Sequence, residues 1–359
     1  MDLLRNWFRR SFSDPQVVIL GVVLLIGFAI VIGLGKYLAP MFASIVIAYL
    51  LEAIVNQLQR IGLPRMLAVI IVFLLFITVL FFLLFGLIPI VSKQLTQLVQ
   101  QFPSYIEKGQ AVLKQLPEAY PQLISEEQVQ IIISQIGQEL GALGQHVLSW
   151  SLASVLNVIG LVIYLVLVPV LVFFLLKDKD LMVGWIADHL PKERTLVNRV
   201  WTESEAQIAN YVRGKVLEIF IVGAVTYVTF IVLGLQYAAL LATIVGFSVL
   251  IPYIGAAVAT IPVALIAYFQ FGWGWGFGQV LIAYAIIQAL DGNVLVPLLF
   301  SEVVNLHPVA IILAILLFGG IWGFWGIFFA IPLATLFKAV LNAWPRKPEE
   351  EVAEEPVAE

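Results

Sequence analysis

Three ionisable side chains, Asp291, Glu302 and His307, stand within 17 residues of each other in a very apolar part of the sequence. Between Ile219 and Phe337 they are the only side chains that can carry charge near neutral pH. A stretch this apolar belongs in lipid, where an ionisable group is costly and by default marks a functional site. A carboxylate and an imidazole in that setting can solvate a small polar solute or exchange a proton.

The segment around these groups is also rich in amides and prolines: Gln288, Asn293, Pro297 and Pro308. Residues 291–307 are too short to cross a membrane alone, so we expect a re-entrant hairpin or a loop at membrane depth. Such a loop must be lined by protein or by a water-filled cavity. Burial favours the neutral form of a carboxyl group, which gives Asp291 or Glu302 a route to proton coupling.

Simpler interpretations of the same residues stay open. Asp291 and Glu302 can cap helix ends at the membrane interface without touching a solute. His307, which directly precedes a proline, can order a turn by hydrogen-bonding the local backbone. No second histidine stands at metal-ligand spacing, so the pattern predicts no metal site.

A proline motif lies further upstream, in a long apolar run: Pro252, Tyr253, Ile254 and Gly255, followed by Pro262. Proline lacks the backbone N–H that an unbroken helix needs, so we expect this helix to kink or break. Transporters use the backbone groups exposed at such breaks to hold ions or substrates. A structural kink without a ligand is the alternative.

Near the C-terminal end, glycines at helical spacing predict close helix packing. They are Gly319, Gly320, Gly323 and Gly326. Two of them form a GxxxG motif, which lets another backbone approach closely. The same smooth surface would let helices slide during gating, and the sequence does not separate the two uses.

The composition, 62% hydrophobic and 12% charged, predicts an all-α polytopic membrane protein embedded in a lipid bilayer. A crossing needs about 20 apolar residues. By this criterion we expect eight spans: 17–35, 38–55, 66–91, 150–176, 216–236, 238–268, 273–290 and 308–341. Residues 1–91 then carry the first three spans, and residues 216–341 form the C-terminal core.

The positive charges predict the orientation of these spans. With eight crossings and both termini cytoplasmic, 15 of the 19 Lys and Arg residues fall on the cytoplasmic side. Residues 92–149 then form an extracytoplasmic segment of amphipathic helices, with Leu95, Leu98 and Phe102 on one face. Residues 177–215 form a cytoplasmic amphipathic connector. Residues 342–359 are an acidic tail with little to bury, so we expect disorder there.

Several functional classes find no support in the sequence. There is no cysteine, no glycine-lysine loop for nucleotides and no set of residues typical of an intramembrane hydrolase, so we predict neither a cofactor nor an enzyme. The net charge of −4 gives no basic surface for nucleic acid. The apolar faces of segment 92–149 leave assembly into a homo-oligomer open.

Taken together, these residues resemble the autoinducer-2 exporter family, also called the PerM-like permeases. The resemblance spans nearly the whole chain and includes Leu306-His307-Pro308 and Tyr211-Val212-Arg213-Gly214 before the fifth span. It implies eight spans, a large extracytoplasmic segment and export of small solutes, with members linked to the furanone-derived signal autoinducer-2. One departure is that Ser301 and Glu302 stand where the family commonly has glycine and a basic residue.

The sequence therefore predicts a secondary transporter that exports a small solute, with coupling to protons or sodium open. Its predicted pathway residues are Pro252, Tyr253, Gly255, Gln288, Asp291, Asn293, Pro297 and His307. A sodium/proton antiporter, similar to some family members, and a membrane scaffold that transports nothing are the alternatives.

Overall fold

The computed structural model describes residues 15–119, 158–189, 195–252, 254–300 and 306–343, with single positions between 125 and 134. Every regular element in these residues is a helix, which confirms the all-α class. Six described helices are long and apolar enough to cross a membrane: Tyr37–Arg60, Arg65–Ala111, Thr195–Val232, Ile254–Phe271, Trp275–Phe300 and Phe324–Asn342. The chain is therefore a multi-pass membrane protein.

The chain divides into two compact units. One comprises Met1–Tyr37, Gly184–Ala209 and Glu302–Glu359, and the other Leu38–Val183 and Asn210–Ser301. Two long helices, α2 (Pro15–Arg60) and α8 (Thr195–Val232), contribute residues to both. The second unit holds most of the residues predicted to form the pathway.

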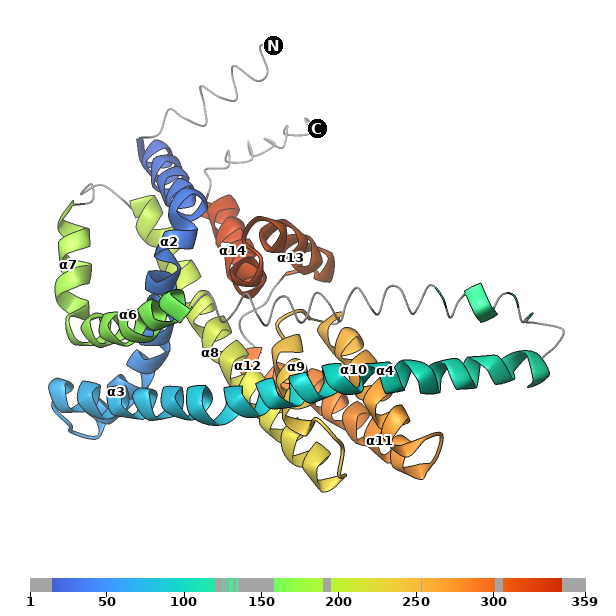
Figure 1. The fold of residues 1–359 in the computed structure, drawn as a ribbon. Helices are drawn as coiled ribbons and strands as arrows, with labels where there is room; N and C mark the ends of the chain where they lie inside the picture. The colour runs from blue at the N-terminus through green and yellow to red at the C-terminus, as the bar shows by residue number, and fades with distance from the viewer. Residues whose placement is uncertain are drawn as a thin grey trace, which may run out of the picture. The chain divides into compact units, whose positions relative to one another are not determined.

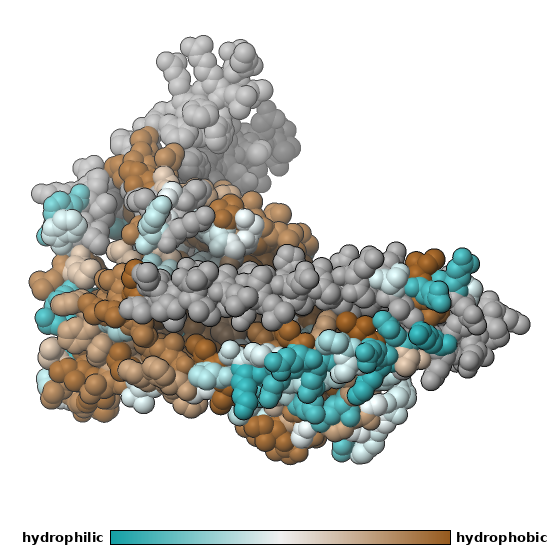
Figure 2. Space-filling model, in the orientation of Figure 1, coloured by the Kyte–Doolittle hydropathy of each residue, from teal (hydrophilic) through white to brown (hydrophobic). Residues whose placement is uncertain are grey.

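In the second unit, α3 (Arg65–Phe82), the π-helical turn η1 (Leu83–Leu87) and α4 (Ile88–Ala119) follow one another without a break (Figure 1). At 1.5 Å per residue this rod is about 80 Å long, far more than the ~30 Å of a hydrocarbon core. Figure 2 shows mainly hydrophobic side chains where α3 lies and many hydrophilic ones along α4. The rod therefore changes from lipid-facing to water-facing along its length.

The helix α3 packs against α2 and α6 (Val158–Lys177) through a small apolar core that includes Val55, Val69 and Val172. Ion pairs also connect these helices. The buried Glu52 carboxylate lies 3.5 Å from the Arg65 guanidinium and 3.2 Å from the ammonium of Lys179, the first residue of α7 (Lys179–His189).

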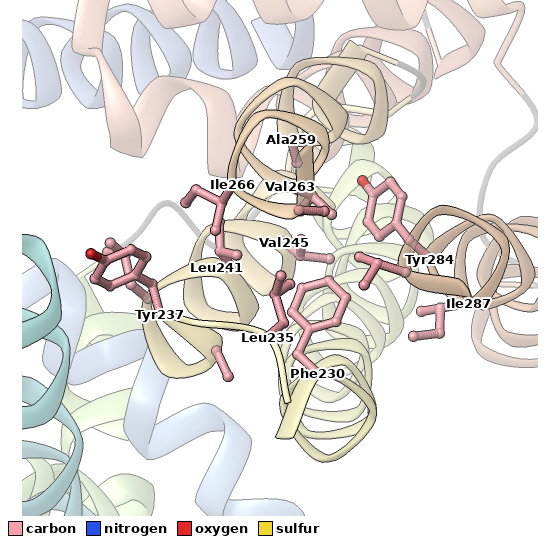
Figure 3. Packing of buried hydrophobic residues seen from close by; sticks show 14 of the residues in the cluster. Phe230, Leu235, Tyr237, Leu241, Val245, Ala259, Val263, Ile266, Tyr284 and Ile287 are labelled. Carbon is pink, nitrogen blue, oxygen red and sulfur yellow. The ribbon is translucent and has the colours of Figure 1, made fainter. Parts of the chain in front are cut away.

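The main core of the second unit joins α8 to three helices: α9 (Ala238–Ser248), α10 (Ile254–Phe271) and α11 (Trp275–Leu290). Figure 3 shows Phe230, Leu241, Val245, Val263 and Tyr284 packed together from all four. Lipid tails are as apolar as these side chains, so close van der Waals packing, rather than exclusion of water, holds such helices together. This core fixes the ends of α9, which border the candidate site.

The first unit contains a helical hairpin of α13 (Pro308–Trp322) and α14 (Phe324–Ala343). The two helices pack along each other and turn at Gly323, whose φ of 58° and ψ of −129° suit only glycine. A separate core in this unit is formed by Leu20, Val200 and Ala339 from α2, α8 and α14.

Four boundaries differ from the sequence prediction. The expected first two spans are one helix, α2, which tolerates Pro40 in its interior. The connector 177–215 runs into the fifth span, because α8 starts at Thr195. The expected eighth span is the α13–α14 hairpin. Residues 291–300 of the segment expected to form a re-entrant hairpin or a loop are helical: α11 continues through the π-helical turn η2 (Asp291–Leu295) into α12 (Val296–Phe300).

The predicted break in the sixth span is confirmed. The helix α9 ends at Ser248 and α10 begins at Ile254, with Pro252 in the turn between them. The prolyl nitrogen has no hydrogen to donate to the preceding turn, so the helix cannot continue through this position without loss.

Candidate functional site

A buried ion pair lies in α8, within the second unit. The Nζ atom of Lys215 lies 2.6 Å from a carboxylate oxygen of Glu218, one helical turn later. Lys215 is 4% exposed and Glu218 2% exposed, inside a helix apolar enough to span a membrane. Burying two charges costs free energy, and burying one of them without its partner costs more. Ionisable groups inside a membrane helix usually have a function, so this pair is a candidate functional site.

The Lys215 ammonium has further neighbours from two other elements. It donates a hydrogen bond of 3.0 Å to the backbone carbonyl of Val249, which caps the C-terminal end of α9. It also lies 5.1 Å from the ring centre of Phe300 in α12 and 6.0 Å from that of Tyr211 in α8. A carboxylate, a carbonyl and two aromatic faces thus surround one positive charge, and each of them stabilises it.

A glycine makes this arrangement possible. A Cβ atom on Gly214 would lie 2.7 Å from the Phe300 ring and 3.3 Å from the carbonyl oxygen of Leu299. Any larger residue would therefore push α12 away from α8. Because Gly214 has no side chain, the Phe300 ring can approach the ammonium of Lys215, the next residue in the sequence.

A second carboxylate, Asp291 in η2, interacts electrostatically with both Lys215 and Glu218. Its Oδ1 atom is buried, and no described residue gives that atom a hydrogen-bond partner. The same holds for Nε2 of Gln288, one turn earlier in α11. A buried polar atom without a partner is costly, which makes the Asp291 oxygen a candidate ligand-binding atom. The Gln288 side chain also interacts with the Tyr284 hydroxyl.

The opposite end of α9 is held by α4. The Gln94 side chain accepts a 2.8 Å hydrogen bond from the backbone N–H of Leu240, one of the first amides of α9. Nearby, the Tyr237 hydroxyl donates a 2.8 Å hydrogen bond to Gln101. Burial raises the pKa of Tyr237, so this hydroxyl keeps its proton. Side chains from other helices therefore satisfy one backbone group at each end of this short helix.

The charges of the cluster do not balance. The cluster consists of one ammonium, Lys215, and two carboxylates, Glu218 and Asp291, so it carries one negative charge when all three groups are ionised. Inside a membrane protein such an excess is compensated by a bound cation or by a proton on one carboxylate. The arrangement can therefore take up and release one positive charge.

Comparison with known proteins places this chain in a family. The family model for AI-2E family transporters matches residues 18–346. The chain belongs to the AI-2E transporter family. It is 47% identical to PerM of Escherichia coli, which is named as a permease, over 96% of this chain and 98% of PerM. YueF of Bacillus subtilis, named as a transport protein, is 29% identical over 84% of this chain and 82% of YueF.

Of the pathway residues predicted for this AI-2E family chain, the structure brings some to the cluster. Asp291 belongs to the cluster, and Gln288 lies one turn before it in the same continuous helix. Pro252 and Gly255 border the α9–α10 turn, where a Cβ atom on Gly255 would collide with the carbonyl of Ser248. Tyr253 and Glu302 lie outside the described residues.

Other predicted residues are placed elsewhere. Asn293 is exposed and donates a 2.8 Å hydrogen bond to the carbonyl of Ala289, one turn earlier in its own helix. Pro297 is exposed within α12. His307 belongs to the first unit, where it is exposed and its Nδ1 accepts a 3.3 Å hydrogen bond from the N–H of Val309. This is the simpler interpretation, a histidine that caps a helix.

The predicted packing glycines all lie in the α13–α14 hairpin. Gly323 forms its turn, and added Cβ atoms on Gly319 and Gly326 would meet Ile327 and the carbonyl of Phe318. Gly320 has nothing within 4 Å of an added Cβ atom. Three of the four therefore serve the fold of the hairpin.

The central ion pair does not follow from the sequence pattern. Lys215 is the last residue of the expected cytoplasmic connector, and Glu218 lies one residue before the long apolar stretch. One signal was available, the i, i+3 spacing of opposite charges in helix-forming sequence. It indicates an ion pair but does not reveal burial, because burial depends on α9 and α12 covering this face.

Proposed function

We propose that this chain is a secondary transporter that exports a small polar solute across the cell membrane, and that the Lys215–Glu218–Asp291 cluster is the site that couples export to protons. The observation that carries the proposal is the ion pair at 2.6 Å, nearly fully buried in a membrane-spanning helix of a transporter-family chain. A structural bundle has no need of such a costly group.

The position of the cluster supports a transport role over a purely structural one. It lies where α9 breaks, and broken helices near the membrane centre are where transporters bind substrates and coupling ions. The buried Asp291 oxygen offers an acceptor to a polar solute, and the Gln288 amide lies one turn earlier in the same helix. We infer from the family resemblance that the solute is a furanone-derived signal of the autoinducer-2 kind, and that both termini are cytoplasmic.

Proton coupling follows from the charge count. When Glu218 or Asp291 takes a proton, the cluster becomes neutral and the cost of burying it falls. When the proton leaves, the excess negative charge returns and favours a conformation with more access to water. Alternation between these two states gives a physical basis for coupled transport.

The test is solute flux in vesicles that contain the purified protein, with furanone signals, sodium and lithium offered under an imposed pH gradient. We expect Asp291→Asn to abolish flux driven by the gradient. Asn293→Ala is the matched control, because this exposed residue lies half a turn away and bonds only its own helix, so its flux should stay near wild type. Equal flux in both variants would remove Asp291 from the mechanism.

The same assay separates the alternatives. A sodium/proton antiporter would move sodium in the absence of any furanone, and a scaffold would move none of the offered solutes. Either result would contradict the proposed export function.

A further inference from the structure

We propose that the Lys215 ammonium permanently occupies a site that would otherwise bind a monovalent metal cation, so that the wild-type protein has no sodium site at the α9–α10 break. The inference deepens the proposed transport function, since it concerns the coupling ion of the same site. It is argued from the contacts of one atom, Lys215 Nζ.

The first step concerns the ligands. Where a membrane helix is interrupted, the carbonyl groups at the C-terminal end of the half-helix are a common binding place for Na⁺. Here the carbonyl at that end, from Val249, accepts the Lys215 hydrogen bond at 3.0 Å. The Glu218 oxygen at 2.6 Å supplies the anionic ligand that a bound cation would use. Both oxygens face the ammonium instead of a metal ion.

The second step concerns the aromatic rings. The Phe300 ring at 5.1 Å and the Tyr211 ring at 6.0 Å close the space around the ammonium. Aromatic faces attract organic cations such as ammonium groups, whereas a small hard metal ion prefers oxygen ligands. The rings therefore favour the lysine over sodium at this position.

The third step concerns charge. With Lys215 fixed in place, the cluster needs only one more positive charge to become neutral, and a proton on Glu218 or Asp291 supplies it. If the ammonium is removed, two carboxylates remain with no cation, and the vacated volume lies between an oxygen of Glu218 and the carbonyl of Val249. Lys215→Ala removes the charge together with most of the side-chain volume, and this variant should therefore acquire a sodium site.

The experiment measures sodium binding and not transport. Purified wild type and Lys215→Ala are compared for saturable binding of radioactive sodium, and for thermal stability in sodium chloride against choline chloride of equal ionic strength. We expect no sodium-specific response from the wild type. Lys215→Ala should bind sodium saturably and be stabilised by it.

Two further variants make the result specific. Lys215→Met removes the charge but fills the space, so it should gain no sodium response. Adding Glu218→Gln to Lys215→Ala removes an anionic ligand, so it should abolish the acquired response. A response of Lys215→Ala that is equal in sodium and choline would overturn the inference.

The wild-type protein also provides a test that needs no variant to fold. Saturable sodium binding by the wild type near neutral pH would overturn the inference, and its absence would support it. Because binding is measured at equilibrium, failure of the transport proposal gives a different result: no solute flux in vesicles, with sodium binding by Lys215→Ala still acquired.

Discussion

Replacement of Lys215 by methionine should destabilise the protein strongly. At an effective dielectric constant of about 20, charges as close as those of Lys215 and Glu218 attract by roughly 6 kcal/mol before the cost of burial is counted. Much of that attraction offsets the cost of removing both charges from water. Loss of one partner of a buried pair typically costs about 3–5 kcal/mol, and we expect Lys215→Met to fall in this range.

Replacement of Glu218 by glutamine should cost less, about 1–3 kcal/mol. Lys215 would keep its electrostatic attraction to Asp291, and the glutamine oxygen can accept a hydrogen bond from the ammonium. The two substitutions thus nearly conserve side-chain volume but leave different charge imbalances. In the double variant Asp291 alone remains ionisable, and protonation makes it neutral.

Non-additivity is the quantity that tests this reasoning. The double variant should be more stable than the sum of the single costs predicts, by about 1–3 kcal/mol. The assay is unfolding by sodium dodecyl sulfate titration in mixed micelles, followed by circular dichroism for all four proteins. If the two costs add to within about 0.5 kcal/mol, the pair does not interact energetically, and the charge argument for the site is refuted.

Three further substitutions test the surroundings of the site and the hairpin. Gln94→Ala should cost about 1–3 kcal/mol, because the buried N–H of Leu240 loses its acceptor, and hydrogen exchange at this amide should accelerate. Gly214→Ala should cost about 1–3 kcal/mol in unfolding experiments, since Phe300 must move. Gly323→Ala should cost about 1–3 kcal/mol in the same experiments, because its backbone conformation suits only glycine.

Each of these substitutions has a matched control on the same kind of helix. Gln97→Ala, at an exposed position of α4, should change the free energy of unfolding by less than about 0.5 kcal/mol. Gly278→Ala and Gly320→Ala meet nothing within 4 Å and replace glycine inside a helix, so each should stabilise by up to about 1 kcal/mol. Equal effects in a variant and its control would contradict the local explanation for that position.

Much of the architecture could be predicted from apolar runs alone. Lipid forces backbone polar groups into helices, so the helical class and most spans follow from composition. The break at Pro252 followed from the chemistry of one residue. The eighth span was misjudged because Gly323 was weighed as a packing residue, whereas its backbone conformation turns the chain.

The expected loop after residue 290 shows why polar residues mislead in a membrane protein. Asp291 and Asn293 look like loop residues, yet η2 accommodates them within the helix, and Asn293 bonds the carbonyl of Ala289. A helix satisfies its own backbone, so at membrane depth it outcompetes a loop even where the side chains are polar.

The candidate site could be predicted only where a single residue reveals its role. In the cluster Lys215 contacts Val249, 34 residues later in the sequence. At the other end of α9 Gln94 contacts Leu240, 146 residues later. Neither pairing has a local pattern. Yet the two contacts obey one physical rule: the amides at the start of α9 meet a carbonyl oxygen, and the carbonyls at its end meet a cation.

This rule explains why the charge on Lys215 matters beyond its ion pair. An 11-residue helix is about 16 Å long and cannot cross the hydrocarbon core. Its two ends therefore cannot lie in water on opposite sides of the membrane. Its terminal groups must then be satisfied by protein. Gln94 can do this at one end without charge. At the other end the ammonium of Lys215 contacts both the Val249 carbonyl and the Glu218 carboxylate, and a cation is what satisfies these two oxygens together. A lysine fixed in α8 meets that need without an ion from solution.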